Sequence, residues 1–230
     1  MPVLRKVFFL NFLLLLQSLY GFDPRITGKE VGFDFRGEYN RSLLNSIDFA
    51  GTGALELNEL YTFKGGLSMG STGDSFDIKI FTQGKIGPLF NILHFSFAYI
   101  YNGLPAYEYQ THTLLPFVSV YGRWAGISFG PAFRFSRFFG ETTLHESMWS
   151  FSGYVNFINT DKMVIGIKVA NFSDFYVGNM GSYSYRFYSL IHINDQWSII
   201  NDIELMQSGS VGLSASFYGI AYRGGFRFTW

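Results

Sequence analysis

The sequence contains no cysteine and no excess of charge of either sign, and both absences narrow the possible classes of protein. Without cysteine the chain has no disulfide, no Cys-ligated metal, no Cys nucleophile and no lipid-modified N-terminal Cys. Lysine plus arginine and aspartate plus glutamate number 17 each, so the charge balance indicates no nucleic-acid surface. No glycine-rich nucleotide-binding loop is present either, and we expect no cofactor.

Long hydrophobic runs are also missing, apart from one near the N-terminus. Arg5 and Lys6 precede an apolar run from Val7 to Leu16, which at about ten residues is too short to cross a bilayer as a helix. This pattern is typical of an export signal, and we expect cleavage after Gly21. The predicted organisation is a signal peptide, residues 1–21, and one mature domain, residues 22–230. No later segment is apolar for long enough to form a transmembrane helix.

Aromatic residues and glycine are what the sequence has in abundance. It contains 27 Phe, 15 Tyr and 26 Gly, a composition that favours strands and tight turns over Ala- and Leu-rich helices. The mature chain is therefore exported and apolar but has no helical anchor. A closed β-barrel is the other structure that satisfies every backbone hydrogen bond in lipid, and these properties favour it.

Alternation between apolar and polar residues supports this interpretation. Val31, Phe33 and Phe35 alternate with Asp34 and Arg36, which places them on opposite faces of a strand. Counting this one, the chain contains twelve segments of about ten residues, the length that a tilted membrane strand needs, and all but one of them alternate clearly. We therefore predict an all-β, antiparallel, up-and-down transmembrane barrel of about twelve strands. Ten or fourteen strands are the alternatives, because both termini on one side require an even number.

One segment does not follow the pattern, and the connectors between segments differ in length. Leu114 to Arg123 alternates only weakly, so its faces are left unassigned. Trp124, Trp197 and Trp230 fall at the rim expected to carry short turns and both termini, as an interfacial aromatic girdle would require. Short turns are expected near Asn58, at Ile86 to Pro88, Arg123 to Ala125, Asn159 to Lys162 and Asn194 to Gln196; longer loops are expected at Arg41 to Asn45, Gly70 to Ser75, Asn102 to Thr111, Phe138 to Glu146, Asn171 to Ser182 and Gln207 to Tyr218.

The end of the chain carries a recognisable motif. Arg223, Gly225, Phe228 and Trp230 supply a basic residue, a glycine two positions on, and alternating aromatic residues that end the chain. This motif resembles the C-terminal assembly signal of bacterial outer-membrane β-barrels. The resemblance implies an outer-membrane location in a diderm envelope, contact with outer-membrane lipid, and recognition of the last strand by the barrel-assembly machinery.

The charged faces of the predicted strands point into the barrel. An ion-pair network that only stabilises a narrow barrel is one interpretation of them, and a conduit for small polar solutes is another. Asp202 and Glu204 are expected to face Arg223 and Arg227. The predicted lumen-lining residues are Glu30, Asp34, Arg36, Glu38, Asp48, Glu56, Lys64, Asp77, Lys79, Lys85, Arg134, Lys168, Arg186, Asp202, Glu204, Arg223 and Arg227.

Three functional hypotheses follow from this architecture. The first is a small porin-like channel. The second is a non-conducting barrel whose aromatic loops, Leu104 to Tyr109 and Phe172 to Tyr185, contact a partner. The third is a lipid hydrolase, since His112, His145, Ser136 and Ser147 fall near one rim, although no nucleophile-elbow motif accompanies them. We assign no catalytic or metal-binding residue, and expect His94 and His192 to form hydrogen bonds in the lumen.

Overall fold

The computed structural model describes residues 26–40, 46–57, 61–72, 75–89, 93–105, 108–138, 142–172, 182–208 and 216–230. The predicted signal peptide lies outside these residues, as does most of the predicted loop Phe172 to Tyr185. No helix in the described ranges is long and apolar enough to span a membrane. The strands are β1 (Ile26–Asn40), β2 (Ser46–Leu57), β3 (Tyr61–Thr72), β4 (Ser75–Leu89), β5 (Leu93–Leu104), β6 (Tyr109–Tyr121), β7 (Ala125–Phe138), β8 (Thr142–Asn159), β9 (Met163–Ala170), β10 (Ser182–His192), β11 (Trp197–Ser208) and β12 (Ser216–Thr229).

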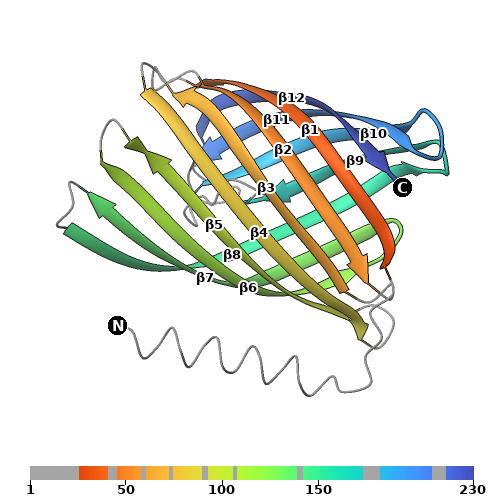
Figure 1. Ribbon diagram of the computed structural model, residues 1–230, viewed down its shortest axis with the longest axis horizontal. Coiled ribbons are helices and arrows are strands. Elements are labelled where there is room, and N and C mark those ends of the chain that lie inside the picture. Colours follow the sequence, from red (N-terminus) through yellow and green to blue (C-terminus); the bar gives the residue numbers. More distant parts are fainter. Residues whose placement is uncertain are drawn as a thin grey trace.

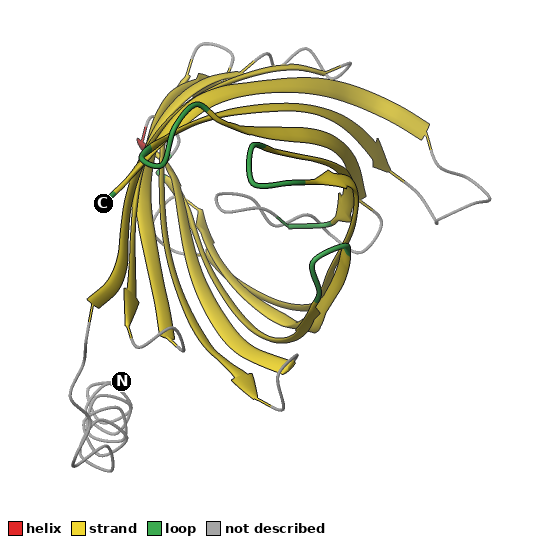
Figure 2. Ribbon diagram, turned by 90° about the vertical axis from the view of Figure 1, so that its right-hand side faces the viewer, coloured by secondary structure: helices red, strands yellow, loops and turns green. Residues whose placement is uncertain are grey.

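These strands form one closed antiparallel barrel. Each strand pairs with its neighbours in sequence, and β1 pairs with β12 from Glu30 opposite Thr229 to Asn40 opposite Gly219. The tilted strands run side by side in Figure 1, and Figure 2 shows the wall curling round into a ring. The predicted fold class is therefore confirmed, with twelve strands rather than the alternative ten or fourteen.

The outer wall is apolar over its whole circumference. On β1, for example, Val31, Phe33 and Phe35 are 39–51% exposed, while Asp34 between them is 3% exposed. Aromatic pairs on this surface link neighbouring strands, such as Phe33 with Phe226 (ring centroids 6.1 Å apart). Similarly exposed apolar residues occur on every strand from β1 to β12, including Ile47, Phe63, Ile80, Phe97, Leu114, Phe133, Val155, Ile167, Phe187, Ile203 and Tyr222. A closed barrel that shows this surface outward has the form required for hydrocarbon surroundings.

The two rims are less different than the sequence suggested. The rim that carries the start of β1 and the end of β12, here called the terminal rim, has the connectors 58–60, 90–92, 122–124, 160–162 and 193–196. At the opposite rim, the connectors 73–74, 105–108 and 139–141 are equally short, so the predicted long loops at Gly70 to Ser75, Asn102 to Thr111 and Phe138 to Glu146 were wrong. Strands β3, β4, β7 and β8 continue further than their hydrophobic alternation does, because polar residues also pair in the ladder. The connector 41–45 has the bounds that were predicted for it, and longer connectors lie at 171–181 and 209–215.

The predicted turn at Ile86 to Pro88 lies inside β4. Gly87 has φ of 132°, a conformation that disfavours any other residue, and the β4–β5 register shifts between Ile86 and Leu89. A glycine–proline pair therefore marks a bulge rather than the chain reversal, which follows at 90–92. The three tryptophans do lie at the terminal rim, with Trp124, Trp197 and Trp230 40–54% exposed.

Strand β6 explains why the segment from Leu114 to Arg123 hardly alternates. Leu114 and Val118 face outward and are 44% and 42% exposed, whereas Leu115 and Phe117 face inward and are 0% and 4% exposed. Both faces of the strand are therefore apolar. The inward face is apolar because it packs against other apolar residues inside the barrel, which local sequence does not reveal.

Candidate functional site

A network of ion pairs covers the inner wall where the barrel closes, on β10, β11, β12, β1 and β2. Its centre is the Asp34 carboxylate, which accepts hydrogen bonds from Arg223 Nη2 at 2.7 Å and Arg227 Nη1 at 3.2 Å. Arg227 also contacts Glu30, with Nε 3.2 Å from Oε1. Arg223 Nη1 lies 3.6 Å from Asp202 Oδ2, as expected from the facing positions of these residues.

The network continues along β10 and β11 in a way the sequence did not indicate. Glu204 was expected to face Arg223 or Arg227, but its partners are Arg186 at 3.3 Å and Arg36 at 3.1 Å. In the register of β11 and β12, Glu204 lies opposite Ala221, so its carboxylate contacts Arg186 on β10 and, past β12, Arg36 on β1. Arg36 Nη2 in turn lies 3.3 Å from Glu38 Oε2.

Glycines make room for these charged groups. A Cβ atom at Gly32 would overlap the Arg227 guanidinium, and a Cβ atom at Gly225 would overlap the Asp34 carboxylate. Gly225 also belongs to the C-terminal motif. Its contact with Asp34 gives a packing reason for glycine at this position of the motif. The ionic groups thus lie flat against the wall instead of projecting across the lumen.

The substitution Gly32→Val tests this close packing. We expect it to lower the free energy of unfolding by about 1–3 kcal/mol, because the valine side chain displaces Arg227 from Asp34. Gly51→Val is the matched control, since a Cβ atom there meets nothing within 4 Å and valine favours strands. Urea titration in lipid vesicles, followed by tryptophan fluorescence, measures both. Equal losses of stability would contradict the packing role of Gly32.

The remaining predicted lumen residues lie on the inner face of other strands. Lys79 Nζ forms an ion pair with Asp48 at 3.1 Å, and Arg134 lies 3.6 Å from Glu146. Three lysines instead lie over aromatic rings: Lys64 over Phe81, Lys85 over Tyr121, and Lys168 over Phe172, at 5.5, 4.8 and 5.8 Å from the ring centroids. Glu56 is half-buried at the end of β2, and the side chain of Asp77 lies outside the described residues.

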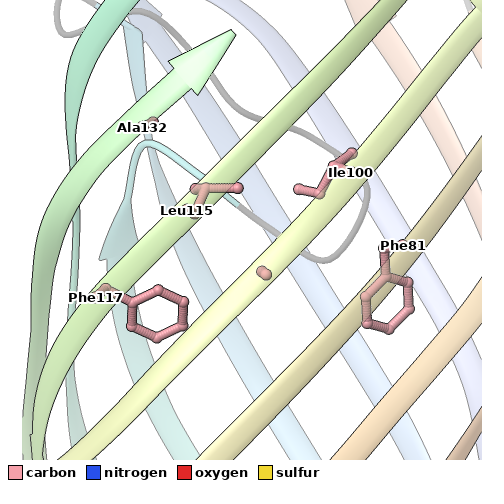
Figure 3. Packing of buried hydrophobic residues seen from close by; sticks show 6 residues of the cluster. Phe81, Ile100, Leu115, Phe117 and Ala132 are labelled. Atoms are coloured by element: carbon pink, nitrogen blue, oxygen red, sulfur yellow. The ribbon is translucent and has the colours of Figure 1, made fainter. Parts of the chain in front are cut away.

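An apolar cluster occupies the inner wall opposite the ion-pair network. It comprises Phe81, Ala98, Ile100, Leu115, Phe117 and Ala132 on strands β4 to β7, all at most 8% exposed (Figure 3). Met148 and Phe172 pack against it, and the rings of Phe117 and Phe172 are 5.6 Å apart. Sequence reasoning missed this cluster, although the apolar residues on both faces of β6 were its signal. The inner wall is therefore ionic on one side and apolar on the other.

Asn171 holds Phe172 in this position. Just beyond the end of β9, the Asn171 side chain donates to Trp149 O and accepts from Phe151 N, both at 2.8 Å. These bonds, together with Asn171 N donating to Phe151 O at 3.2 Å, extend the pairing with β8 past the end of the regular strand. Because both the NH2 group and the oxygen of its side-chain amide bind backbone groups, Asn171 is well suited to fixing the backbone at Phe172.

The residues of the hydrolase hypothesis lie on both faces of the barrel wall. His112 and His145 lie on the outer face, on either side of Phe135 in the register of β6, β7 and β8, while Ser136 is buried on the inner face. His112 Nδ1 is 2.7 Å from the Tyr99 hydroxyl. Ser147 pairs with Phe133 and also faces outward. The wall thus separates Ser136 from both histidines, and the arrangement does not form a triad.

The other two histidines lie on the inner face near the terminal rim. His192 Nδ1 is 2.8 Å from Ser198 Oγ, the kind of lumen hydrogen bond expected for it. His94 instead contacts the Tyr121 ring, with centroids 5.2 Å apart, and its Nδ1 has no hydrogen-bond partner. Within the described residues, no group of three or more His, Asp or Glu side chains could hold a metal ion.

The closed twelve-stranded barrel, its apolar outer surface and its ionic inner wall define the chain as having the fold of bacterial outer-membrane β-barrels. No protein-family model and no curated protein sequence matches the chain.

Solved structures show the likeness in fold. The translocator domain of the autotransporter NalP from Neisseria meningitidis aligns with 99% of this chain and 97% of its own, at 13% identity and a TM-score of 0.55. The NanC porin aligns over 85% of this chain and 98% of its own, at 10% identity and a TM-score of 0.54. The KdgM porin, solved with a disordered oligogalacturonate, aligns over 86% of this chain and 98% of its own, at 9% identity and a TM-score of 0.53. At these identities the likeness concerns the fold alone.

Proposed function

We propose that the protein lies in the outer membrane of a diderm bacterium and forms a channel for small polar solutes. The observation that carries this proposal is the distribution of side chains across the wall: hydrocarbon and aromatic rings outside, carboxylates, guanidinium groups and hydroxyls inside. Ionised side chains on an inner wall are useful where water and polar solutes pass, and costly where none do. The similarity to two porins supports a porin-like barrel.

Conductance of the purified protein in a planar bilayer tests the channel. We expect discrete current steps whose size rises with salt concentration, because ions would pass along the ionic side of the wall. Insertion is verified independently by protease protection of the same protein reconstituted in vesicles of the same lipid. A bilayer that stays silent although the barrel is inserted would contradict the proposal.

A non-conducting barrel is the second candidate, and the apolar cluster is the observation that favours it. Leu115, Ile100 and Phe81 are at most 1% exposed, so this part of the inner wall is covered by packed atoms rather than open to solvent. Phe172 contributes to that cover from beyond the end of β9. Under this second function, the barrel would serve as a scaffold whose outer surface or loops contact a partner.

The variant Phe172→Ala decides between the two candidates when it is tested beside the native protein. If the cluster narrows a conducting lumen, the variant should give larger current steps, because the ring contact with Phe117 is lost. The control is Phe187→Ala, which removes a ring from the outer wall and should leave the conductance unchanged. Silence from all three proteins would favour the scaffold.

For the C-terminal motif we propose recognition by the barrel-assembly machinery. Phe228 and Trp230 stack at 5.4 Å, and Phe228 also contacts Trp197 at 4.8 Å, which forms an aromatic patch at the terminal rim. Trp230 is 54% exposed and is available to a partner before or during closure. Arg223 and Gly225 serve the closed barrel as well, through the Asp34 carboxylate.

A further inference from the structure

We propose that the inner wall near the terminal rim contains a binding site for a small oxyanion, a carboxylate or phosphate group, formed by Lys85, His94 and Ser96. These residues are on the adjacent strands β4 and β5. The inference deepens the proposed channel function by naming the chemical class of a solute that would bind in the lumen. If the barrel binds the anion but does not conduct, the proposed channel function is wrong and the proposed anion site still holds.

Two buried polar atoms of this site lack a partner. His94 is 8% exposed and Ser96 is 1% exposed, and neither His94 Nδ1 nor Ser96 Oγ forms a hydrogen bond. The two residues are two positions apart on β5 and thus share its inner face. A buried polar atom that remains unpaired costs about 1–3 kcal/mol, so two neighbouring ones indicate a ligand or solvent that completes them. A third such atom, Ser150 Oγ, lies on β8 and is not part of the site.

The third group is a cation without a carboxylate partner. Lys85 lies opposite Ser96 in the register of β4 and β5, and its Nζ is 4.8 Å from the centre of the Tyr121 ring. Among the described residues it forms no ion pair; Glu56, in the same row but two strands away on β2, acts on it only through its charge. Lys79, six residues earlier on the same face of β4, is by contrast neutralised by Asp48. Lys85 therefore retains donors for an anion.

Tyr121 organises these groups. Its ring contacts both the Lys85 ammonium and the His94 imidazole, and a third ring, Tyr154, lies 6.2 Å away. The Tyr121 hydroxyl is fixed by Ser128, with the two oxygens 3.2 Å apart. An ammonium and an imidazole beside one aromatic ring, with the Ser96 hydroxyl on the same inner face two residues along β5, provide charge and several donors, which an oxyanion accepts. The chloride ion, with one atom, would satisfy fewer of these donors.

Histidine NMR provides the test, because the chain has only four histidines. Protein labelled in the histidine rings is titrated in detergent micelles with inorganic phosphate and with acetate, at constant ionic strength maintained by sodium chloride. We expect the His94 signal to shift in a saturable way, while the signals of His112, His145 and His192 move little. Lys85→Met should weaken binding at least about tenfold, and Lys85→Arg should largely restore it.

Lys79→Met is the matched control, since it removes a lysine from the same face of the same strand that is already paired with Asp48. It should leave the affinity for phosphate unchanged. The proposal is overturned if phosphate and acetate do not move the His94 signal, if chloride moves it equally, or if Lys85→Met binds as the native protein does. Folding of each variant is verified by its resistance to unfolding in detergent. If Lys85→Met folds poorly, Lys85→Arg still tests the site, because an arginine that keeps the charge should bind phosphate and acetate.

Discussion

Asp34→Ala is expected to lower the free energy of unfolding by about 3–5 kcal/mol, the cost of removing one member of a buried ion-pair network. The Asp34 carboxylate is 3% exposed and binds two guanidinium groups, those of Arg223 and Arg227. Without it, two buried cations lose the carboxylate that they share, and among the described residues Asp202 at 3.6 Å from Arg223 and Glu30 at 3.2 Å from Arg227 remain as acidic neighbours. Because these contacts join β1 to β12, the loss falls on the pair of strands that closes the barrel. Closure removes the two free edges of the sheet, so weakening it affects the whole barrel.

Urea unfolding in lipid vesicles measures this effect, with Glu38→Ala as the control. Glu38 is on the same face of β1, but among the described residues its ion pair is with Arg36, which keeps Glu204 as a second partner. Its side chain is also more exposed, so we expect a loss of about 1 kcal/mol or less. Asp34→Asn should be intermediate, since the amide keeps the shape but not the charge. If Asp34→Ala lowers the free energy of unfolding no more than Glu38→Ala does, the network of ion pairs does not stabilise closure of the barrel.

The fold could be predicted from the local alternation of apolar and polar residues, because each strand of this barrel separates hydrocarbon from a polar interior. Val31, Phe33 and Phe35 on β1 are a clear case, and the facing charges of Asp202 and Arg223 followed from the order of the strands alone. The strand ends were predicted less well. Gly87 and Pro88 carry the composition of a turn, yet β4 continues through them to Leu89. Residue preferences mark an irregularity in the chain but not whether the strand resumes after it.

The candidate sites depend on contacts that connect distant strands, and these were less predictable. Phe172 reaches Phe117 three strands away, and Arg36 reaches Glu204 from β1 to β11. Neither pair is adjacent in any strand register, so no local pattern records it. Lys85 and Lys79 look alike in the sequence, and only the position of Asp48 distinguishes the neutralised lysine from the other. The closed barrel, and not the local sequence, therefore determines which charged groups remain available to a ligand.

Ile203→Arg is expected to destabilise the barrel in a lipid bilayer by about 2–4 kcal/mol, the cost of an arginine near the bilayer midplane on the lipid face. Ile203 lies in the middle of β11, is 48% exposed, and pairs with Phe187 and Tyr222, which also face outward. An exposed isoleucine in a water-soluble protein would accept arginine with little change in stability. The substitution therefore measures what surrounds the outer wall.

Ile193→Arg is the matched control, because Ile193 is 61% exposed but lies at the terminal rim, in the connector between β10 and β11. At the membrane interface the cost of an arginine falls to about 0–1 kcal/mol. Both variants are unfolded by urea in vesicles of the same lipid and compared with the native protein. A large loss for Ile203→Arg with a small one for Ile193→Arg places the middle of the barrel in hydrocarbon, because only depth in the bilayer distinguishes two exposed isoleucines. Two equally small losses would mean that water surrounds the outer wall, and the proposed membrane location would then be wrong.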